Sequence, residues 1–315
     1  MIRIGAHMSI AGGYYRAVET AAEMGCDVVQ LFLKNNNQWR AKPITDDDVD
    51  RFRTALETHR IEQPLAHASY LINLASPDRA LWEKSIAALV VELERAARLG
   101  VPHVVVHPGA YTTSTPKQGM RRIARALDRV HRTLGPHPAS VLLENTAGQG
   151  TVLGWDFHQL AQIIDQCRAP ERVGVCIDTC HAFAAGYAWS PAGRFRETVG
   201  QLGELIGWER IKALHINDSK RELGSRVDRH AHIGAGQIGI EGFHRIVRHR
   251  HLRRIPMYLE TPKGDDPDTG RPWDRINLER IRELAQRPLT QGTPARNGGT
   301  SGGPKGRVGR TRRKD

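Results

Sequence analysis

The residues from Val173 to His181 read Val-Gly-Val-Cys-Ile-Asp-Thr-Cys-His. Small and β-branched residues run up to Asp178 without a polar break, as in a strand that is buried on both faces. We expect a turn after Asp178 that presents His181 three residues later. A lone Asp-x-x-His is more often a hydrogen-bonded loop or a helix cap than a metal site. Its meaning therefore depends on how the other strands of the chain end.

Strand-like and helix-like segments alternate on both sides of this stretch. Segments with the apolar runs of buried strands lie at 3–7, 28–33, 61–67, 104–107, 140–144, 173–178, 211–216 and 257–260. Helical patterns lie at 12–25, 46–60, 81–99, 117–134, 157–167, within 193–206, at 240–250 and at 277–286. Apolar strands that alternate with helices indicate a parallel sheet covered by helices. Eight such units in residues 1–287 predict an α/β protein with a single (β/α)8 TIM barrel.

An open, doubly wound sheet is the alternative architecture. Proteins with that fold often carry a glycine-rich phosphate loop directly after a strand. The sequence has neither a Gly-x-Gly-x-x-Gly motif after the first strand nor a Gly-Lys-Ser/Thr loop. The barrel is therefore the favoured prediction.

The composition is that of an ordinary globular protein, with 39% hydrophobic and 25% charged residues. No apolar run approaches the roughly 20 residues that a membrane span requires, and the first residues begin as a strand without a signal-peptide pattern. Four cysteines in a chain of 315 residues do not form a disulfide framework. We therefore expect a cytoplasmic protein with reduced thiols and no membrane partner. Nothing in the sequence demands more than a monomer, and we expect one.

The formal net charge of +12 calls for a polyanionic partner or a basic tail. Residues 288–315 are rich in Gly, Pro, Thr, Ser and Arg and cannot build a core. We expect this segment to be a disordered basic tail. Its charge could bind nucleic acid non-specifically, or it could be a solvated tail without an essential role.

Successive strands end on a histidine or a carboxylate. The residues at these ends are His67, His107, Glu144, Asp178, His215 and Glu260. In a barrel these ends share the C-terminal rim, where the active sites of such enzymes lie. Because side chains alternate along a strand, the residue two before each end can also point inward. The inward pairs are Leu65 with His67, Val105 with His107, Leu142 with Glu144, Cys176 with Asp178, and Ala213 with His215.

Six such side chains on one rim would be a costly group of like charges and desolvated imidazoles unless cations held them together. We therefore predict a metal site at the C-terminal rim. The loop after the seventh strand adds Asp228 and His230, which are two residues apart and can face the same side of an extended segment. Together with His181 they supply two imidazoles and a carboxylate, a set suited to a further metal. The alternative interpretation of this loop is a surface segment of mixed charge.

Six stretches of this sequence resemble the endonuclease IV family. They are Pro-Leu-Ala-His-Ala-Ser-Tyr-Leu-Ile-Asn-Leu-Ala at 64–75, Val-His-Pro-Gly at 106–109, Leu-Glu-Asn-Thr-Ala-Gly-Gln-Gly at 143–150, Val-Cys-Ile-Asp-Thr-Cys-His-Ala-Phe-Ala-Ala-Gly-Tyr at 175–187, Leu-His-Ile-Asn-Asp-Ser-Lys at 214–220 and Gly-Ser-Arg-Val-Asp-Arg-His at 224–230. The resemblance covers about residues 1–287. Motifs of this length are highly specific.

The resemblance implies a metal-dependent phosphodiesterase of base excision repair. Such an enzyme hydrolyses the backbone of duplex DNA 5′ to an abasic site and leaves a 3′-hydroxyl and a 5′-deoxyribose phosphate. The family uses a TIM barrel with three zinc ions. For this chain the sequence leaves open whether zinc or manganese fills one or more of the sites. Carried over by position, the ligands are His67, His107 and Glu144 for the first ion, Glu144, Asp178, His215 and Glu260 for the second, and His181, Asp228 and His230 for the third. Glu144 and Glu260 are the expected catalytic carboxylates, Glu144 as the bridge and Glu260 as a ligand and proton acceptor.

The resemblance also implies DNA contacts. Tyr70 matches the aromatic residue that the family inserts at the lesion, and Leu71 accompanies it. The family's second-strand recognition loop corresponds to Lys34–Arg40, with Asn37, Gln38 and Trp39 as the expected contacts. The chain departs from the family at Asn37, where some members have an intercalating Arg. It also departs at Ala68, where Asp is common, and at Ala235, where Glu is frequent.

Two other functions remain open from the sequence. A sugar isomerase or epimerase would hold one metal with a set like Glu144, Asp178, His215 and Glu260, but it would leave the other ligand-type residues without a role. A non-catalytic nucleic-acid-binding protein would use the positive charge alone. It would leave the acidic and histidine-rich strand ends unexplained.

Overall fold

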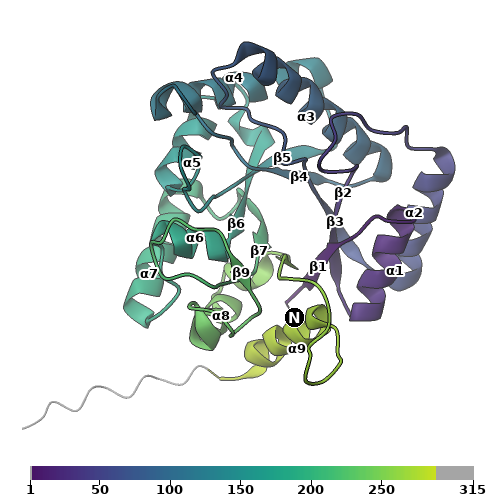
Figure 1. Cartoon of the computed structure of the whole chain (residues 1–315), viewed down its shortest axis with the longest axis vertical. Coiled ribbons are helices and arrows are strands. Elements are labelled where there is room, and N and C mark those ends of the chain that lie inside the picture. Colours follow the sequence, from purple (N-terminus) through teal and green to yellow (C-terminus); the bar gives the residue numbers. More distant parts are fainter. Residues whose placement is uncertain (1, 289–315) are drawn as a thin grey trace, which may run out of the picture.

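A closed ring of eight parallel strands forms the centre of the molecule (Figure 1). The computed structural model describes residues 2–288. The strands are β1 (Ile4–Met8), β2 (Val28–Phe32), β3 (Glu62–His67), β4 (His103–Val106), β5 (Ser140–Glu144), β6 (Val173–Asp178), β7 (Ile211–His215) and β10 (Met257–Leu259). Each strand pairs with the next one along the chain, and β10 closes the ring by pairing with β1. This arrangement confirms the predicted TIM barrel.

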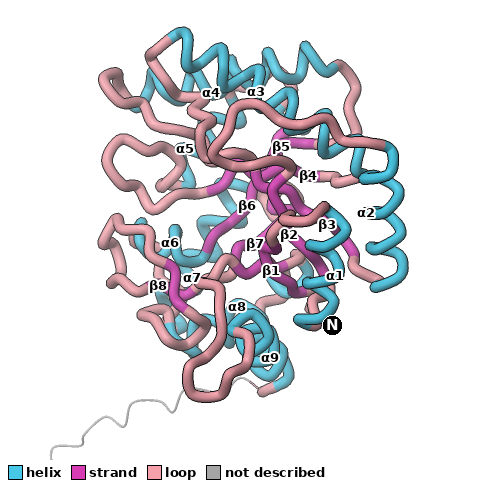
Figure 2. The backbone as a smooth tube through the Cα atoms, turned by 45° about the vertical axis from the view of Figure 1, so that its right-hand side comes forward, coloured by secondary structure: helices cyan, strands magenta, loops and turns pink. Residues whose placement is uncertain are grey.

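Helices surround the ring on the outside (Figure 2). They are α1 (Tyr14–Met24), α2 (Asp46–His59), α3 (Arg79–Leu99), α4 (Pro116–Leu134), α5 (Phe157–Asp165), α6 (Thr179–Ala185), α7 (Ala192–Gln201), α8 (Gly239–Arg248) and α9 (Trp273–Gln286). Local sequence sets their limits. Thr45 and Asp48 form a reciprocal capping box at the start of α2, and Asp78 accepts from backbone amides at the start of α3.

The interior of the barrel is a separate apolar layer. It consists of Val28, Leu65, Val105, Leu142, Cys176, Ala213 and Tyr258, all buried. A larger apolar cluster fills the space between the strands and the helices. The inward pairing predicted from strand alternation is therefore confirmed, since the residue two before each predicted strand end lies in this interior layer.

Close packing inside the ring also explains a glycine. A Cβ atom at Gly5 in β1 would lie 1.7 Å from the backbone oxygen of Val28 in β2. Any larger residue would force the two strands apart. Beside Gly5 in the ring, Tyr258 of β10 donates from its hydroxyl to the backbone oxygen of Gln63 at 2.7 Å.

Some predicted limits were wrong. The turn expected after Asp178 is the first turn of helix α6, because the Asp178 side chain caps that helix. The helix expected within 193–206 is α7 followed by a π-helical turn, Leu202–Ile206. His107 and Glu260 lie directly after β4 and β10 rather than within them. Two short antiparallel strands, β8 (Asp218–Ser219) and β9 (His230–Ala231), were not expected.

Among residues 2–288, no helix combines the length and the apolar composition that crossing a membrane requires. The predicted tail at 288–315 lies, apart from Pro288, outside the described residues. Its predicted disorder therefore stays a prediction, as does the boundary at 287.

Candidate metal centre

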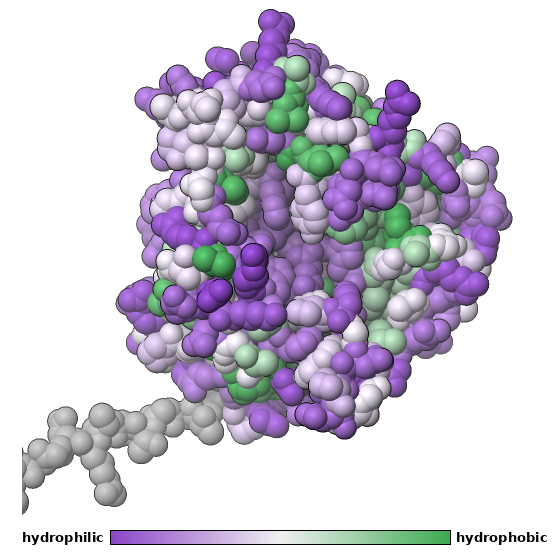
Figure 3. All heavy atoms as spheres, viewed as in Figure 1, coloured by the Kyte–Doolittle hydropathy of each residue, from purple (hydrophilic) through white to green (hydrophobic). Residues whose placement is uncertain are grey.

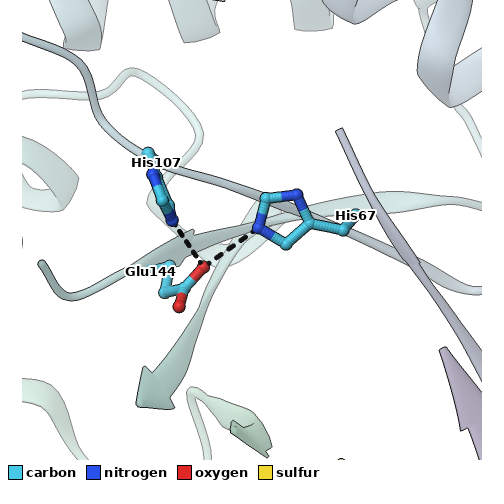
Figure 4. A group of neighbouring side chains, drawn as sticks. All are labelled: His67, His107 and Glu144. Carbon is cyan, nitrogen blue, oxygen red and sulfur yellow. Dashed lines mark hydrogen bonds and ion pairs between the residues drawn. The ribbon is translucent and has the colours of Figure 1, made fainter. Parts of the chain in front are cut away.

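His67, His107 and Glu144 converge at the ends of neighbouring strands β3, β4 and β5 (Figure 4). Nε2 of His67 lies 3.2 Å, and Nε2 of His107 lies 3.1 Å, from the same carboxylate oxygen, Oε2 of Glu144. His67 and Glu144 are buried, while the side chain of His107 is 33% exposed. Two imidazole nitrogens and a carboxylate oxygen this close together form a ligand set that suits zinc.

A second group shares Glu144 with the first. It consists of Glu144, Asp178, His215 and Glu260, from β5, β6, β7 and the end of β10. Nδ1 of His215 lies 2.9 Å from Oε1 of Glu144 and 3.3 Å from Oε2 of Glu260. Glu144 therefore presents one oxygen to each group. The space-filling view shows a hydrophilic hollow in the middle of the molecule (Figure 3).

A third group brings His181, Asp228 and His230 together from separate segments. Oδ2 of Asp228 lies 3.1 Å from Nε2 of His181, and Oδ1 lies 3.2 Å from Nε2 of His230. The cap of helix α6 places His181, because Asp178 accepts from the His181 backbone amide at 2.7 Å. The β8–β9 pairing brings His230 back to the rim. Asp178 lies 3.7 Å from Nε2 of His230, so the second and third groups are adjacent.

The carboxylates of this centre are surrounded by imidazoles. Burial opposes the ionisation of Glu144, but the nearby imidazoles of His215 and His107 outweigh it and hold the pKa of Glu144 well below its ordinary value. Burial likewise opposes protonation of His230, yet Asp178 and Asp228 raise the pKa of this imidazole to about 9. The buried carboxylates are therefore stable only with positive charge beside them, which protons on the imidazoles or metal cations could supply.

The imidazoles are oriented as metal ligands usually are. Three of the imidazoles have Nδ1 within hydrogen-bond distance of a backbone oxygen, to which Nδ1 donates when it carries the ring proton. These contacts are His67 to Ala68 at 2.8 Å, His181 to Asn145 at 3.0 Å and His230 to Glu260 at 3.0 Å. Nε2 of each ring then faces the carboxylates with its lone pair. Nε2 of His230 is buried, and its close polar neighbours among the described residues include the carboxylates of Asp228 and Asp178, with which it forms no well-aligned hydrogen bond. The residues present therefore fit a metal centre.

Sequence reasoning missed two residues of the rim, His7 and Gln30. The amide nitrogen of Gln30 donates to Oε1 of Glu260 at 2.6 Å, and its oxygen lies 2.7 Å from Nε2 of His215. Nδ1 of His7 lies 3.6 Å from Oε1 of Glu260. Both follow the alternation already used, because Gln30 stands two residues after Val28 of the interior layer and His7 stands two after Gly5. A lone polar residue in an apolar strand was the available signal.

Two buried asparagines support Asp178 and were also missed. Asn217 donates from Nδ2 to Oδ2 of Asp178 at 2.7 Å and accepts the backbone amide of Glu260 on its oxygen at 2.8 Å. Asn145 accepts the backbone amide of Asp178 at 2.7 Å. These bonds fix the ends of β6 and β10 relative to each other. Both asparagines follow a ligand-type residue closely in sequence, Asn145 after Glu144 and Asn217 after His215.

Among the residues expected to contact DNA, Tyr70 lies against this centre. Tyr70 is 55% exposed, and its ring centroid lies 5.2 Å from that of His67 and 5.6 Å from that of Phe32. Leu71 is half-buried beside it. In the recognition loop Asn37 and Gln38 are exposed, while Trp39 is half-buried with Nζ of Lys84 4.3 Å from its ring centroid.

Residues 18–286 match the sequence family described as xylose isomerase-like TIM barrels. Relatives named probable endonuclease 4 are similar over most of the chain. The protein of Trichlorobacter lovleyi is 44% identical over 281 residues, which are 89% of this chain and 99% of that protein. The protein of Chloroflexus aurantiacus is 46% identical over 286 residues, which are 91% of this chain and 99% of that protein.

Solved structures give the same picture. Endonuclease IV from Thermus thermophilus matches with a TM-score of 0.78 and 39% identity, over 90% of this chain and 98% of that one. A D-tagatose 3-epimerase-like protein matches with a TM-score of 0.68 and 18% identity, over 90% of this chain and 97% of that one. At 18% identity the second likeness shows a shared barrel fold and nothing more.

Proposed function

The chain belongs to the endonuclease IV family within the xylose isomerase-like TIM barrels, and from this premise we propose that it cuts duplex DNA 5′ to abasic sites with three bound zinc ions. As a member of this family it is a hydrolase, an abasic-site endonuclease of DNA repair. The proposed products are a 3′-hydroxyl and a 5′-deoxyribose phosphate. Manganese in place of zinc at one or more sites is compatible with the same ligands.

The shared position of Glu144 carries the proposal. Its two oxygens face different ligand groups, Oε2 toward His67 and His107 and Oε1 toward His215. A carboxylate in this position can hold two cations side by side. We assign His67, His107 and Glu144 to the first ion and Glu144, Asp178, His215 and Glu260 to the second. His181, Asp228 and His230 would hold the third.

Bound cations would lower the pKa of water and screen the negative charge of the phosphodiester. The protein residues supply the rest. Glu260 is 13% exposed, whereas Glu144 is fully buried, and we assign Glu260 the role of a ligand that would also accept a proton from the attacking water. Its hydrogen bond from Gln30 fixes the direction of that oxygen. A cation held by His181, Asp228 and His230 would offset the negative charge that develops on the leaving 3′-oxygen.

DNA recognition would use the two exposed loops beside the centre. We propose that Tyr70 and Leu71 enter the duplex at the lesion, and that Asn37, Gln38 and Trp39 contact the second strand. Stacking of an aromatic ring on an unpaired base contributes about 1–3 kcal/mol, which favours a site where a base is already missing. We expect one chain to be sufficient, because all proposed ligands come from a single barrel.

Sugar epimerisation is the competing activity on this fold. It would use only the second group, Glu144, Asp178, His215 and Glu260. The convergence of His67 and His107 on Glu144, and of His181 and His230 on Asp228, would then have no purpose. The structure therefore favours phosphodiester hydrolysis.

Incubation of the protein with a duplex that carries one abasic analogue tests the proposal. We expect a single cut whose product length places it directly 5′ to the lesion, loss of cutting with a strong chelator, and recovery on addition of zinc. A duplex of the same sequence without the lesion is the control. A cut 3′ to the lesion, or full activity after chelation and verified metal removal, would contradict the proposal.

A further inference from the structure

A buried ion pair joins the first residue of the recognition loop to helix α3. Nζ of Lys34 lies 3.5 Å from Oε1 of Glu92, and the side chains are only 3% and 1% exposed. Lys34 begins the recognition loop, and Glu92 belongs to helix α3. A charged side chain is seldom buried this deeply unless a partner compensates it, because desolvation of either charge alone is costly.

Lys34 and a second residue of helix α3 bind backbone oxygens of the recognition loop. Nζ of Lys34 donates to the backbone oxygen of Gln38 at 2.6 Å, so the lysine connects the start of the loop to Gln38. One turn further along α3, Arg95 donates to the backbone oxygen of Leu33 at 2.8 Å and to that of Lys42 at 2.7 Å. The loop has no helix or strand of its own between these points. Its shape therefore depends on side chains that approach from α3 and from its own first residue.

The same glutamate reaches the second loop. Oε1 of Glu92 also accepts the backbone amide of Ser69 at 3.2 Å, and Ser69 directly precedes Tyr70. The hydroxyl of Ser69 in turn donates to the backbone oxygen of Asn36. A single carboxylate oxygen thus joins the loop that carries Gln38 and Trp39 to the loop that carries Tyr70.

We propose that Glu92, paired with Lys34, is a positioning residue that sets the spacing between the two DNA-contacting loops before DNA arrives. This inference rests on the proposed function, since it takes both loops as DNA contacts. Loops that are already ordered in the bound arrangement lose less conformational entropy on binding, so the clamp raises affinity without touching DNA.

Glu92→Gln tests the clamp, with Glu94→Gln as the matched control. Glu94 lies on the same helix but is exposed. We expect Glu92→Gln to raise KM and the Kd for abasic duplex about five- to twentyfold. Its zinc content should equal that of wild type, and its kcat should change by less than about twofold, because the ligands and the reacting groups are untouched. Backbone amides at 34–40 and 68–72 should exchange hydrogen faster in the free protein.

Removal of one partner leaves the other charge buried and alone, which can prevent folding. The double variant Lys34→Met with Glu92→Leu removes both charges and should fold. It also removes the bond from Lys34 to Gln38 and the bond from Ser69 to Glu92, so it should show the same rise in KM. Wild-type KM and wild-type exchange in the double variant would overturn the clamp. If the wild-type protein fails to cut abasic duplex while exchange at both loops still rises in Glu92→Gln, the clamp stands and the proposed function falls.

Discussion

The side-chain oxygen of Gln30 lies 2.7 Å from Nε2 of His215, and the two side chains meet above the interior layer of the barrel. This contact assigns the ring proton to Nε2 and leaves Nδ1 free toward Glu144 and Glu260. The amide nitrogen of Gln30 is oriented at the same time by its bond to Glu260. One neutral residue thus sets the direction of an imidazole and of a carboxylate in the proposed second site.

Gln30→Ala should therefore weaken metal binding while leaving the barrel folded. Loss of an outer partner of a metal ligand typically costs about 10- to 100-fold in metal affinity or activity. Competition with a fluorescent chelator measures the affinity directly. Gln162→Ala, on the exposed side of α5, is the control and should behave as wild type. Unchanged zinc affinity in Gln30→Ala would show that His215 is oriented by other contacts.

Tyr70→Ala should weaken binding and cutting of abasic duplex by about ten- to a hundredfold, the value of one stacking contact. Zinc content should not change, because Tyr70 touches His67 only through its ring. Gel-shift titration and elemental analysis together make the test. Metal loss in this variant would instead assign Tyr70 a structural role in support of His67.

The barrel and the ligand-type strand ends could be predicted because they follow from a period of two residues and from the common direction of parallel strands. Leu65, two residues before His67, and Cys176, two residues before Asp178, both lie in the interior layer, as side-chain alternation predicts. The same period applied to Val28 would have found Gln30. An amide is not a usual zinc ligand, so the sequence alone does not mark Gln30, and its role becomes visible only when His215 and Glu260 lie beside it.

Other features have no local signal. Helix α6 is only seven residues long, too short for a helical period, and it exists because Asp178 caps it. The contact between Lys34 and Glu92 joins a loop to a distant helix, and both residues would be read as solvated charges from the sequence alone. Such pairs become visible only when the elements are packed.

Acid should destabilise the protein partly through His103. Burial and the nearby Lys212 lower the pKa of His103 from 6.5 to about 4. Because the folded state binds this proton more weakly than the unfolded state does, the contribution to stability is complete above pH 6.5 and is lost as the pH falls toward 4. His103→Asn should reduce the loss of unfolding free energy between these pH values by about 1–2 kcal/mol, since the group is partly solvated. Denaturant titrations at both pH values measure this.

His59→Asn, at an exposed position, is the control for the exchange of His for Asn itself. Equal pH dependence in His103→Asn and wild type would mean that the imidazole of His103 stays solvated enough to titrate normally.

Removal of residues 292–315 should lower the affinity for undamaged DNA and reduce its dependence on salt. The segment is rich in Arg and Lys. Each of these residues that contacts a phosphate releases counterions from the DNA, which makes binding both tighter and more dependent on salt. Truncation removes these contacts and therefore lowers both the affinity and the salt dependence. Cutting of abasic duplex at saturating concentration should persist. A truncated protein that fails to fold would show that the boundary at 287 is wrong.

The combined change Asp228→Asn with His230→Ala separates a three-ion mechanism from a one-ion mechanism. Both side chains face His181, with Asp228 3.1 Å from it, and neither belongs to the group around Glu144. If they hold a third ion that offsets charge on the leaving oxygen, their loss removes about one metal equivalent per chain. Loss of one such electrostatic stabiliser typically costs about 2.7–4 kcal/mol, so cutting should slow at least about a hundredfold. Binding to abasic duplex should survive because Tyr70 and the recognition loop are unchanged. Elemental analysis and single-turnover cutting measure the two effects. A double variant with full metal content and wild-type rate would leave the third ion without a role. Loss of one metal equivalent together with the slower rate would assign the third ion to the chemical step.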